Sequence, residues 1–227
     1  SYGNYFPVTI DYDEQTYCCT VTPDRYLTGF YQYIVEITTG ATDIHGNPLI
    51  QQYSYTYSTN PAPTDTVVLV YMPADYAGGD YIAGDISEMI QASGSIDPSV
   101  MRIVGIADYP YDANTQLFEG IYGYRRDISL QTAGFAGNEL NTALAQTVSQ
   151  LLSFVNSNYL PQQIIFVLLD RKTKPMWCIA EDETSNARLL IHDFADAVRN
   201  NNISVLVLDA PVKSTVEVGY EFRNSKT

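Results

Sequence analysis

The 227-residue sequence is poor in basic residues: 12 lysines and arginines stand against 26 aspartates and glutamates, which gives a formal net charge of −14. Because such a chain repels phosphate backbones and anionic membrane surfaces, we expect no nucleic-acid partner. The sequence also lacks any apolar run near the roughly 20 residues that a membrane-spanning helix requires. We therefore predict no transmembrane segment within these residues.

Cysteine is scarce as well, and familiar catalytic motifs are absent. The cysteines are Cys18, Cys19 and Cys178, and their spacing does not resemble a zinc site. We expect buried or half-buried free thiols, since adjacent cysteines point to opposite faces of a strand. The phosphate-binding loop, the dinucleotide fingerprint, the serine-hydrolase elbow and the zinc-protease motif are all missing. We therefore expect neither a metal nor a cofactor.

Two regions of different composition follow one another along the chain. Ten of the 19 tyrosines lie in the first 64 residues, where short alternating runs predict β-strands. Pro61 and Pro63 then mark a stiff connection. We expect a small all-β domain over residues 1–60, a linker over 61–65 and a second domain over 66–227.

From residue 66 onward, continuous apolar runs alternate with amphipathic stretches. The apolar runs are typical of strands buried on both faces of a sheet, and they occupy residues 67–72, 101–107, 164–169 and 203–208. Helical spacing covers residues 80–91, 138–156 and 193–200, and a capping box at 214–217 opens a last helix. The pattern predicts an α/β fold, with a mostly parallel sheet and helices on both faces.

Aspartates follow three of these buried strands: Asp75, Asp170 and Asp209. Because the carboxyl ends of parallel strands meet at one edge of a sheet, we expect these side chains to gather there. Carboxylates so placed can bind a cation or act as an acid–base pair, and they can equally cap loops and helix N-termini. Residues 181–183 are all acidic, and we expect a solvated turn there, since three consecutive side chains cannot face one ion.

Residues 66–224 resemble the clostripain-like cysteine peptidases, a family with a caspase-like α/β fold. The matching segments comprise residues 68–75, 85–89, 179–185, 208–210 and 216–224. Catalysis in the family requires a histidine after the third strand and a cysteine after the fourth, and Arg171 and Pro211 stand at those positions here. Arginine stays protonated and proline carries no nucleophile, so the resemblance implies that both catalytic positions are lost.

The same resemblance implies a former substrate pocket for arginine or lysine side chains. Asp209 stands at the position of the family's pocket carboxylate, with Asp170 and Asp75 as neighbours. Three of the 12 basic residues lie in the loop 171–174. We therefore expect Arg171 or Lys172 to form a salt bridge with Asp209 and so to fill the pocket.

Residues 5–60 resemble the second half of a bacterial Ig-like domain of the S-layer type. The resemblance rests on residues 33–43, a turn at 46–49 and an aromatic strand at 53–59. It implies a partial Ig-like domain and display at the cell surface rather than chemistry.

Three functions are compatible with the sequence. The first is a catalytically inactive clostripain-like protein, exported to the surface or periplasm, that binds a peptide or protein ligand, basic ligands included. The second is an active cysteine peptidase that cleaves after arginine or lysine, with Cys178 as a relocated nucleophile and His192 as its partner. The third is a structural surface spacer. An exported protein would carry a signal or anchor segment ahead of Ser1, which is not a natural first residue.

Overall fold

The computed structural model describes residues 7–16, 18–24, 27, 32–59, 63–110, 114–199, 201–211, 213 and 215–223. By their internal contacts the residues form two compact units, 1–62 and 63–227. No helix in the described part of the chain is long and apolar enough to cross a membrane.

The first unit contains two antiparallel hairpins. Strand β1 (Val8–Asp13) pairs with β2 (Cys18–Pro23), and β3 (Gln32–Ile37) pairs with β4 (Tyr53–Ser58). Asp43 stabilises the loop after β3, because one oxygen of its carboxylate accepts the backbone N–H groups of His45 and Asn47 at 2.8 and 2.9 Å. The expected strands are confirmed, and the Ig-like resemblance stays a prediction.

Both hairpins expose apolar side chains, because a two-stranded ribbon buries neither of its faces by itself. Ile10 is 63% exposed and Tyr55 is 59% exposed. Cys18 and Cys19 are exposed as well, so the expectation of buried or half-buried thiols is wrong for this pair. Cys178, in the second unit, is buried as expected.

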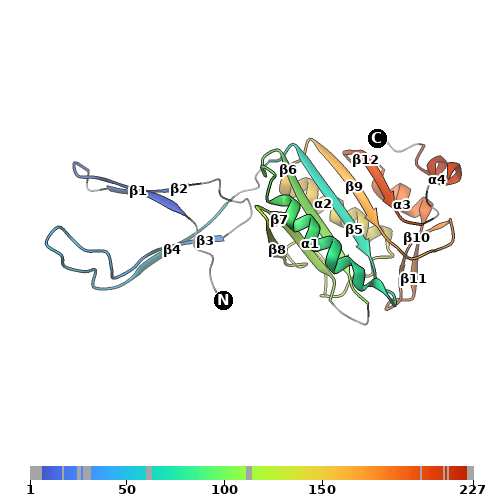
Figure 1. Ribbon diagram of the computed structural model, residues 1–227, viewed down its shortest axis with the longest axis horizontal. Coiled ribbons are helices and arrows are strands. Elements are labelled where there is room, and N and C mark those ends of the chain that lie inside the picture. The colour runs from blue at the N-terminus through green and yellow to red at the C-terminus, as the bar shows by residue number, and fades with distance from the viewer. Residues whose placement is uncertain are drawn as a thin grey trace. The chain divides into compact units, whose positions relative to one another are not determined.

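The second unit is built on a six-stranded sheet with the order β12-β9-β5-β6-β7-β8 (Figure 1). Four strands run parallel: β5 (Thr66–Pro73), β6 (Met101–Asp108), β9 (Gln163–Leu169) and β12 (Ile203–Asp209). Two antiparallel strands extend the sheet on one side: β7 (Gln116–Ile121) and β8 (Tyr124–Ile128). The mostly parallel sheet predicted from the buried apolar runs is confirmed.

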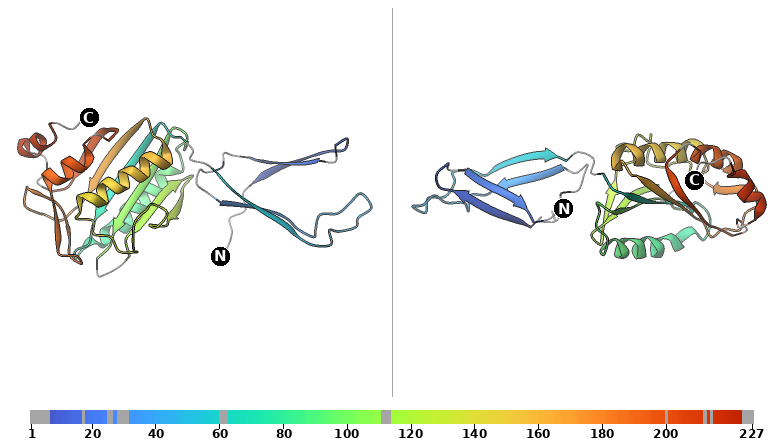
Figure 2. Two further views of the ribbon diagram at one scale, coloured as in Figure 1. Left: turned by 180° about the vertical axis from the view of Figure 1, so that it is seen from behind. Right: turned by 90° about the horizontal axis from the view of Figure 1, so that it is seen from above.

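Helices cover both faces of this sheet (Figure 2). On one face lies α1 (Ile82–Ser93), which follows the short helix η1 (Gly79–Tyr81) and packs against apolar side chains of β5 and β7. On the opposite face lie α2 (Ala145–Tyr159) and α3 (Ile191–Val198), which share a larger core with the sheet. The short helix α4 (Val216–Glu221) begins after Thr215, whose hydroxyl accepts the Val218 N–H at 3.4 Å. The expected capping box starts at Ser214, which lies outside the described residues.

The helix expected over residues 138–156 begins only at Ala145. Backbone N–H groups before this point are already engaged: that of Leu140 donates to the Thr115 hydroxyl, and that of Thr142 donates to the Asp182 carboxylate, both at 2.9 Å. Residues 138–144 therefore form an irregular connection that these side chains fix in place.

A separate hairpin follows β9 and consists of β10 (Cys178–Asp182) and β11 (Ala187–Leu190). The solvated turn expected at residues 181–183 is wrong, because Glu181 and Asp182 end a strand and Asp182 is only 1% exposed. Since side chains alternate along a strand, Asp182 points away from the face that carries Glu181.

A chain of ion pairs crosses the antiparallel side of the large sheet. Glu119 of β7 is fully buried, and its carboxylate lies 2.9 Å from the Arg102 guanidinium of β6 and 2.6 Å from that of Arg126 of β8. Arg102 also donates to the Pro98 carbonyl at 3.0 Å. These contacts tie three neighbouring strands together through their side chains.

Candidate functional site

The carboxyl ends of β5, β9 and β12 bring the three predicted aspartates to one edge of the sheet, where each has a different environment. Asp75 and Asp170 are 1% exposed, whereas Asp209 is exposed. The backbone N–H of Asp170 donates to the Asp209 carbonyl at 3.0 Å, so the last two strand ends are adjacent. The Asp75 carboxylate instead accepts the Thr184 N–H at 2.7 Å.

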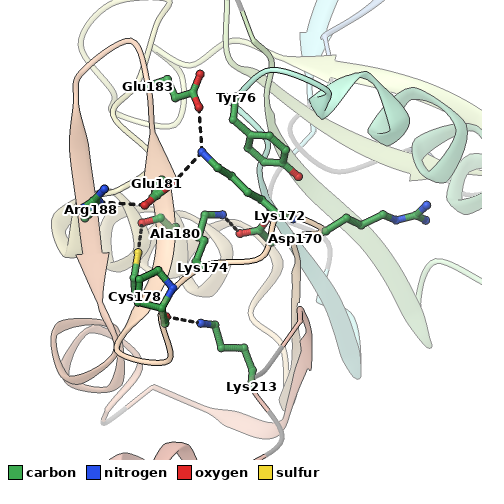
Figure 3. Close-up of polar contacts among 12 residues, drawn as sticks. Tyr76, Asp170, Lys172, Lys174, Cys178, Ala180, Glu181, Glu183, Arg188 and Lys213 are labelled. Atoms are coloured by element: carbon green, nitrogen blue, oxygen red, sulfur yellow. Dashed lines mark hydrogen bonds and ion pairs between the residues drawn. The ribbon is translucent and has the colours of Figure 1, made fainter.

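Asp170 forms a buried ion pair with Lys174, and each side chain is 1% exposed (Figure 3). The other carboxylate oxygen of Asp170 accepts the Lys172 N–H at 2.9 Å. The ammonium groups of Lys172 and Lys174 both lie 5.1 Å from the centre of the Tyr76 ring. The loop after β9 is therefore folded back on its own aspartate.

Arg171 turns towards α1 instead of Asp209. Its guanidinium lies 2.9 Å from the Asp85 carboxylate and 4.7 Å from the centre of the Tyr81 ring, and its backbone N–H donates to the Tyr81 hydroxyl at 3.1 Å. The expected salt bridge from Arg171 to Asp209 is wrong, because α1 presents a carboxylate and an aromatic ring to the same loop.

Lys172 does not reach Asp209 either. Its ammonium lies 2.8 Å from both Glu181 and Glu183, which project from the β10 hairpin (Figure 3). Partial burial disfavours the charges of Lys172 and Glu181, yet the hydrogen bonds outweigh it, so the pKa of Lys172 is raised and that of Glu181 is lowered. Among the described residues, no ion pair involves Asp209.

The sequence analysis considered Pro211, Cys178 and His192 in connection with catalysis, and the structure places each of them as follows. Pro211 lies half-buried in the turn after β12. Cys178 is fully buried, its thiol donates to the Ala180 carbonyl at 3.3 Å, and burial raises the pKa of the thiol. His192 has an exposed side chain that lies 3.0 Å from Asp193. The described contacts of Cys178 and His192 thus do not join these two side chains.

The structure also reveals a carboxylate cluster that the sequence interpretation missed. Carboxylate oxygens of Asp75, Asp108 and Glu139 lie within 4.8 Å of one another, and one metal ion could contact all three. Asp182 adjoins the cluster and raises the pKa of both Asp108 and Glu139. Asp108 ends the buried run of β6, so the strand-end argument that selected Asp75 also applies to it. Glu139 carries no such signal, because the periodicity of its segment predicts a helix.

Burial and mutual repulsion raise the pKa of two carboxyl groups of this cluster, those of Asp108 and Glu139. Burial, followed by the charges of Glu139, Asp182 and Asp75, raises the pKa of Asp108 to about 8, although a 2.5 Å hydrogen bond from the Thr142 hydroxyl opposes the shift. Burial and the charges of Asp75 and Asp182 likewise raise the pKa of Glu139 to about 7. Perturbed carboxyl groups of this kind are typical of functional sites and also of structural clusters.

A cavity of about 740 Å³ lies on the antiparallel side of the sheet. Polar side chains line most of it: Asn114, Thr115, Gln116, Arg125, Asp127, Ser129, Gln131 and Asn138. None of the predicted site residues contributes to its wall.

Three solved structures share the fold of the second unit. They are a secreted C11 cysteine protease from Bacteroides thetaiotaomicron in complex with an irreversible peptide inhibitor (19% identity, TM-score 0.58), the same organism's secreted C11 protease "iotapain" (15%, 0.59) and an inactive zymogen C11 protease from Parabacteroides distasonis (23%, 0.56). The matches cover 71%, 73% and 73% of this chain, but 47%, 51% and 47% of those chains. The chain therefore spans about half the length of these structures, and the likeness establishes its caspase-like α/β fold.

A comparison with curated proteins gives no match. The family model for the clostripain family, by contrast, matches residues 70–227, which is well over half of the sequence. The chain belongs to the clostripain family.

Proposed function

We propose that the chain is a catalytically inactive member of the clostripain family whose second unit binds a peptide or protein segment. The observation that carries the proposal is the loop after β9. The position expected for the catalytic histidine holds Arg171, which is engaged with Asp85 and Tyr81, and the position expected for the cysteine holds Pro211. Neither residue can supply a base or a nucleophile for acyl transfer.

The environment of Cys178 argues against the alternative of a relocated nucleophile. A catalytic cysteine reacts as a thiolate, which requires an accessible sulfur and a lowered pKa. Cys178 is 0% exposed, and burial together with the charge of Glu181 raises its pKa despite nearby Lys174 and Lys213. His192, its supposed partner, is paired with Asp193 instead.

Asp209 is the residue that favours a basic ligand. It is exposed at the end of β12, and no ion pair among the described residues engages its carboxylate. The net charge of −14 also attracts basic ligands towards the protein. One matched relative carries a peptide inhibitor, which supports peptide recognition by this fold.

Binding and turnover are tested together on the full chain. Fluorescein-labelled alanine peptides with a central arginine, lysine or glutamine are titrated by fluorescence anisotropy. We expect the basic peptides to bind up to about fivefold more tightly than the glutamine peptide, as an exposed ion pair allows. Asp209→Asn should abolish this difference, whereas Asp193→Asn, the same change at an aspartate whose side chain is 46% exposed, should preserve it.

We also expect no cleavage of arginyl or lysyl amide substrates. Turnover that disappears in Cys178→Ala would contradict the proposal and establish the relocated nucleophile. Absence of both turnover and peptide binding would instead favour the structural spacer, the third function compatible with the sequence.

We further propose that the protein is exported. Two of the matched relatives are described as secreted, and the Ig-like resemblance of residues 5–60 supports display at a surface. Fractionation of the producing cells should find the protein in the periplasm, at the surface or in the medium, and a strictly cytoplasmic pool would contradict this proposal.

A further inference from the structure

Each hairpin of the first unit has one apolar face and one polar face. Side chains alternate between the faces along a strand, and residues directly opposite each other on paired strands share a face. The pairing of β1 with β2 gathers six uncharged residues on one face: Val8, Ile10, Tyr12, Cys19, Val21 and Pro23. The opposite face is polar and holds the aspartates of β1, Asp11 and Asp13.

The hairpin of β3 and β4 repeats this division. On its apolar face Val35 lies opposite Tyr55. The next pair on the same face joins Ile37 with Tyr53. Glu36 lies on the other face, so the charged residue of β3 also points away from the apolar side chains. The two hairpins are separate two-stranded sheets (Figure 1), and each therefore presents its own apolar face.

Much of this apolar surface is in contact with solvent. Seven side chains of the two faces are between 37% and 63% exposed: Val8, Ile10, Tyr12, Val21, Ile37, Tyr53 and Tyr55. A tyrosine side chain offers about 200 Å² of surface to a partner and a valine or isoleucine about 100 Å², so the exposed parts add up to roughly 500 Å². Covering an apolar surface of this size releases water from it and is favourable.

We propose that the first unit forms a homodimer, in which the apolar faces of its two hairpins pack against those of a second copy of this chain. An isolated two-stranded hairpin is marginally stable in water, so a covering layer stabilises each hairpin. The dimer goes beyond the proposed peptide-binding function of the second unit and does not depend on it.

The size of the exposed surface fits a dimer. A specific interface of standard size buries about 800 Å² on each partner, and homodimer interfaces are about 65% apolar. Such an interface requires about 500 Å² of apolar surface from each copy, which matches the area that the seven side chains expose.

The chemistry of the two faces favours a second copy over a charged ligand. Among the described residues, the apolar faces include no acidic or basic side chain that would recognise a ligand of opposite charge. In a twofold-symmetric dimer the same patch meets itself, and an uncharged apolar patch does so without repulsion. Tyr12, Tyr53 and Tyr55 suit this contact, because a tyrosine buries its ring while its hydroxyl reaches water at the rim of an interface.

Sedimentation velocity on the full chain tests the dimer, with a reducing agent present so that Cys18 and Cys19 cannot cross-link two copies. Between about 1 and 100 µM, the mass should rise from the 25.3 kDa of one chain towards twice that value. Raising sodium chloride from about 50 to 500 mM should strengthen the dimer, since salt screens the repulsion between two copies that each carry a net charge of −14.

Neighbouring residues on opposite faces provide matched variants. Val21→Glu and Tyr55→Glu place a charge on the apolar face of each hairpin and should weaken the dimer at least about tenfold. Thr22→Glu and Thr56→Glu place the same charge on the polar faces and should change the dissociation constant by less than about twofold.

Three results would overturn the dimer. They are a chain that stays monomeric at about 100 µM and high salt, a dimer that the two apolar-face variants do not weaken, and a dimer that all four variants weaken equally. Should the glutamate variants fail to fold, hydrogen exchange of the unaltered chain decides. Strands β1 to β4 should then gain protection as the protein concentration rises, whereas β5 and β9 should not, and the proposal fails if the protection of the first unit is independent of concentration.

Discussion

Lys174 and Asp170 form a buried ion pair at the carboxyl edge of the sheet, in the loop that also carries Arg171. Position 170 could be predicted from the sequence, because an aspartate at the end of a buried strand must reach the carboxyl edge of the sheet. The partner could not, because Lys174 reaches Asp170 only through the path of the loop between them. The expectation that Asp209 would receive a basic side chain failed for the same reason: Asp85, Glu181 and Glu183 come from elements whose positions only the fold fixes.

At this scale we predict that Lys174→Met destabilises the second unit by about 3–5 kcal/mol, because it leaves the carboxylate of Asp170 buried without its counter-charge. Arg171→Met is the matched control: the arginine is 59% exposed, so its ion pair with Asp85 is worth about 0–1 kcal/mol. Urea denaturation of both variants measures the difference. The double variant Asp170→Asn with Lys174→Met should recover part of the lost stability. Equally small losses in Lys174→Met and Arg171→Met would contradict the argument that the pair is buried.

At the scale of single elements, the hydrophobic periodicity of the sequence predicts the secondary structure incompletely. The strand and helix patterns of the sequence assign no element to residues 116–124, which form β7 and the start of β8 with a turn at Tyr122 and Gly123 between them. Both turn residues have positive φ, 52° and 79°, as two-residue hairpin turns often require. Tyrosine is uncommon in this conformation, so the dipeptide carries no strong turn signal. The tight turn nevertheless brings Arg126 of β8 to Glu119 of β7.

We predict that Glu119→Gln destabilises the antiparallel side of the sheet by about 3–5 kcal/mol. The change keeps the shape of the side chain but removes the negative charge between Arg102 and Arg126, whose guanidinium groups are largely buried. Asp127→Asn on β8 removes an exposed partner of Arg125 and should cost about 0–1 kcal/mol. Thermal unfolding followed by circular dichroism compares the two variants. A loss below about 1 kcal/mol for Glu119→Gln would show that the arginines are neutralised or solvated in another way.

At the scale of the whole molecule, the layered α/β architecture could be predicted, because strands buried on both faces must be sandwiched between helices. The carboxylate cluster could not, since it depends on the convergence of four segments. It also explains why residues 138–144 depart from the predicted helix: Asp108 and Asp182 engage Thr142 and hold the connection in an irregular path. The raised pKa values of Asp108 and Glu139 predict that the stability of this unit depends on pH.

The last prediction concerns this dependence. Unfolded aspartate and glutamate have pKa values near 4, whereas Asp108 and Glu139 have folded pKa values of about 8 and about 7. Between these limits the folded state binds more protons than the unfolded state, so the stabilising contribution is complete below about pH 4 and is lost as the pH rises to about 8. Glu181 and Glu183 have lowered pKa values in the folded state, so their pH dependence has the opposite sign. Their stabilising contribution is lost only in acid. We therefore expect maximal stability near pH 5 and a decline of roughly 1.4 kcal/mol per pH unit for each proton released. Urea denaturation midpoints measured from about pH 4 to 9 test this prediction. Asp108→Asn should flatten the decline of stability at alkaline pH. A stability maximum at pH 7–8 would contradict the raised pKa values.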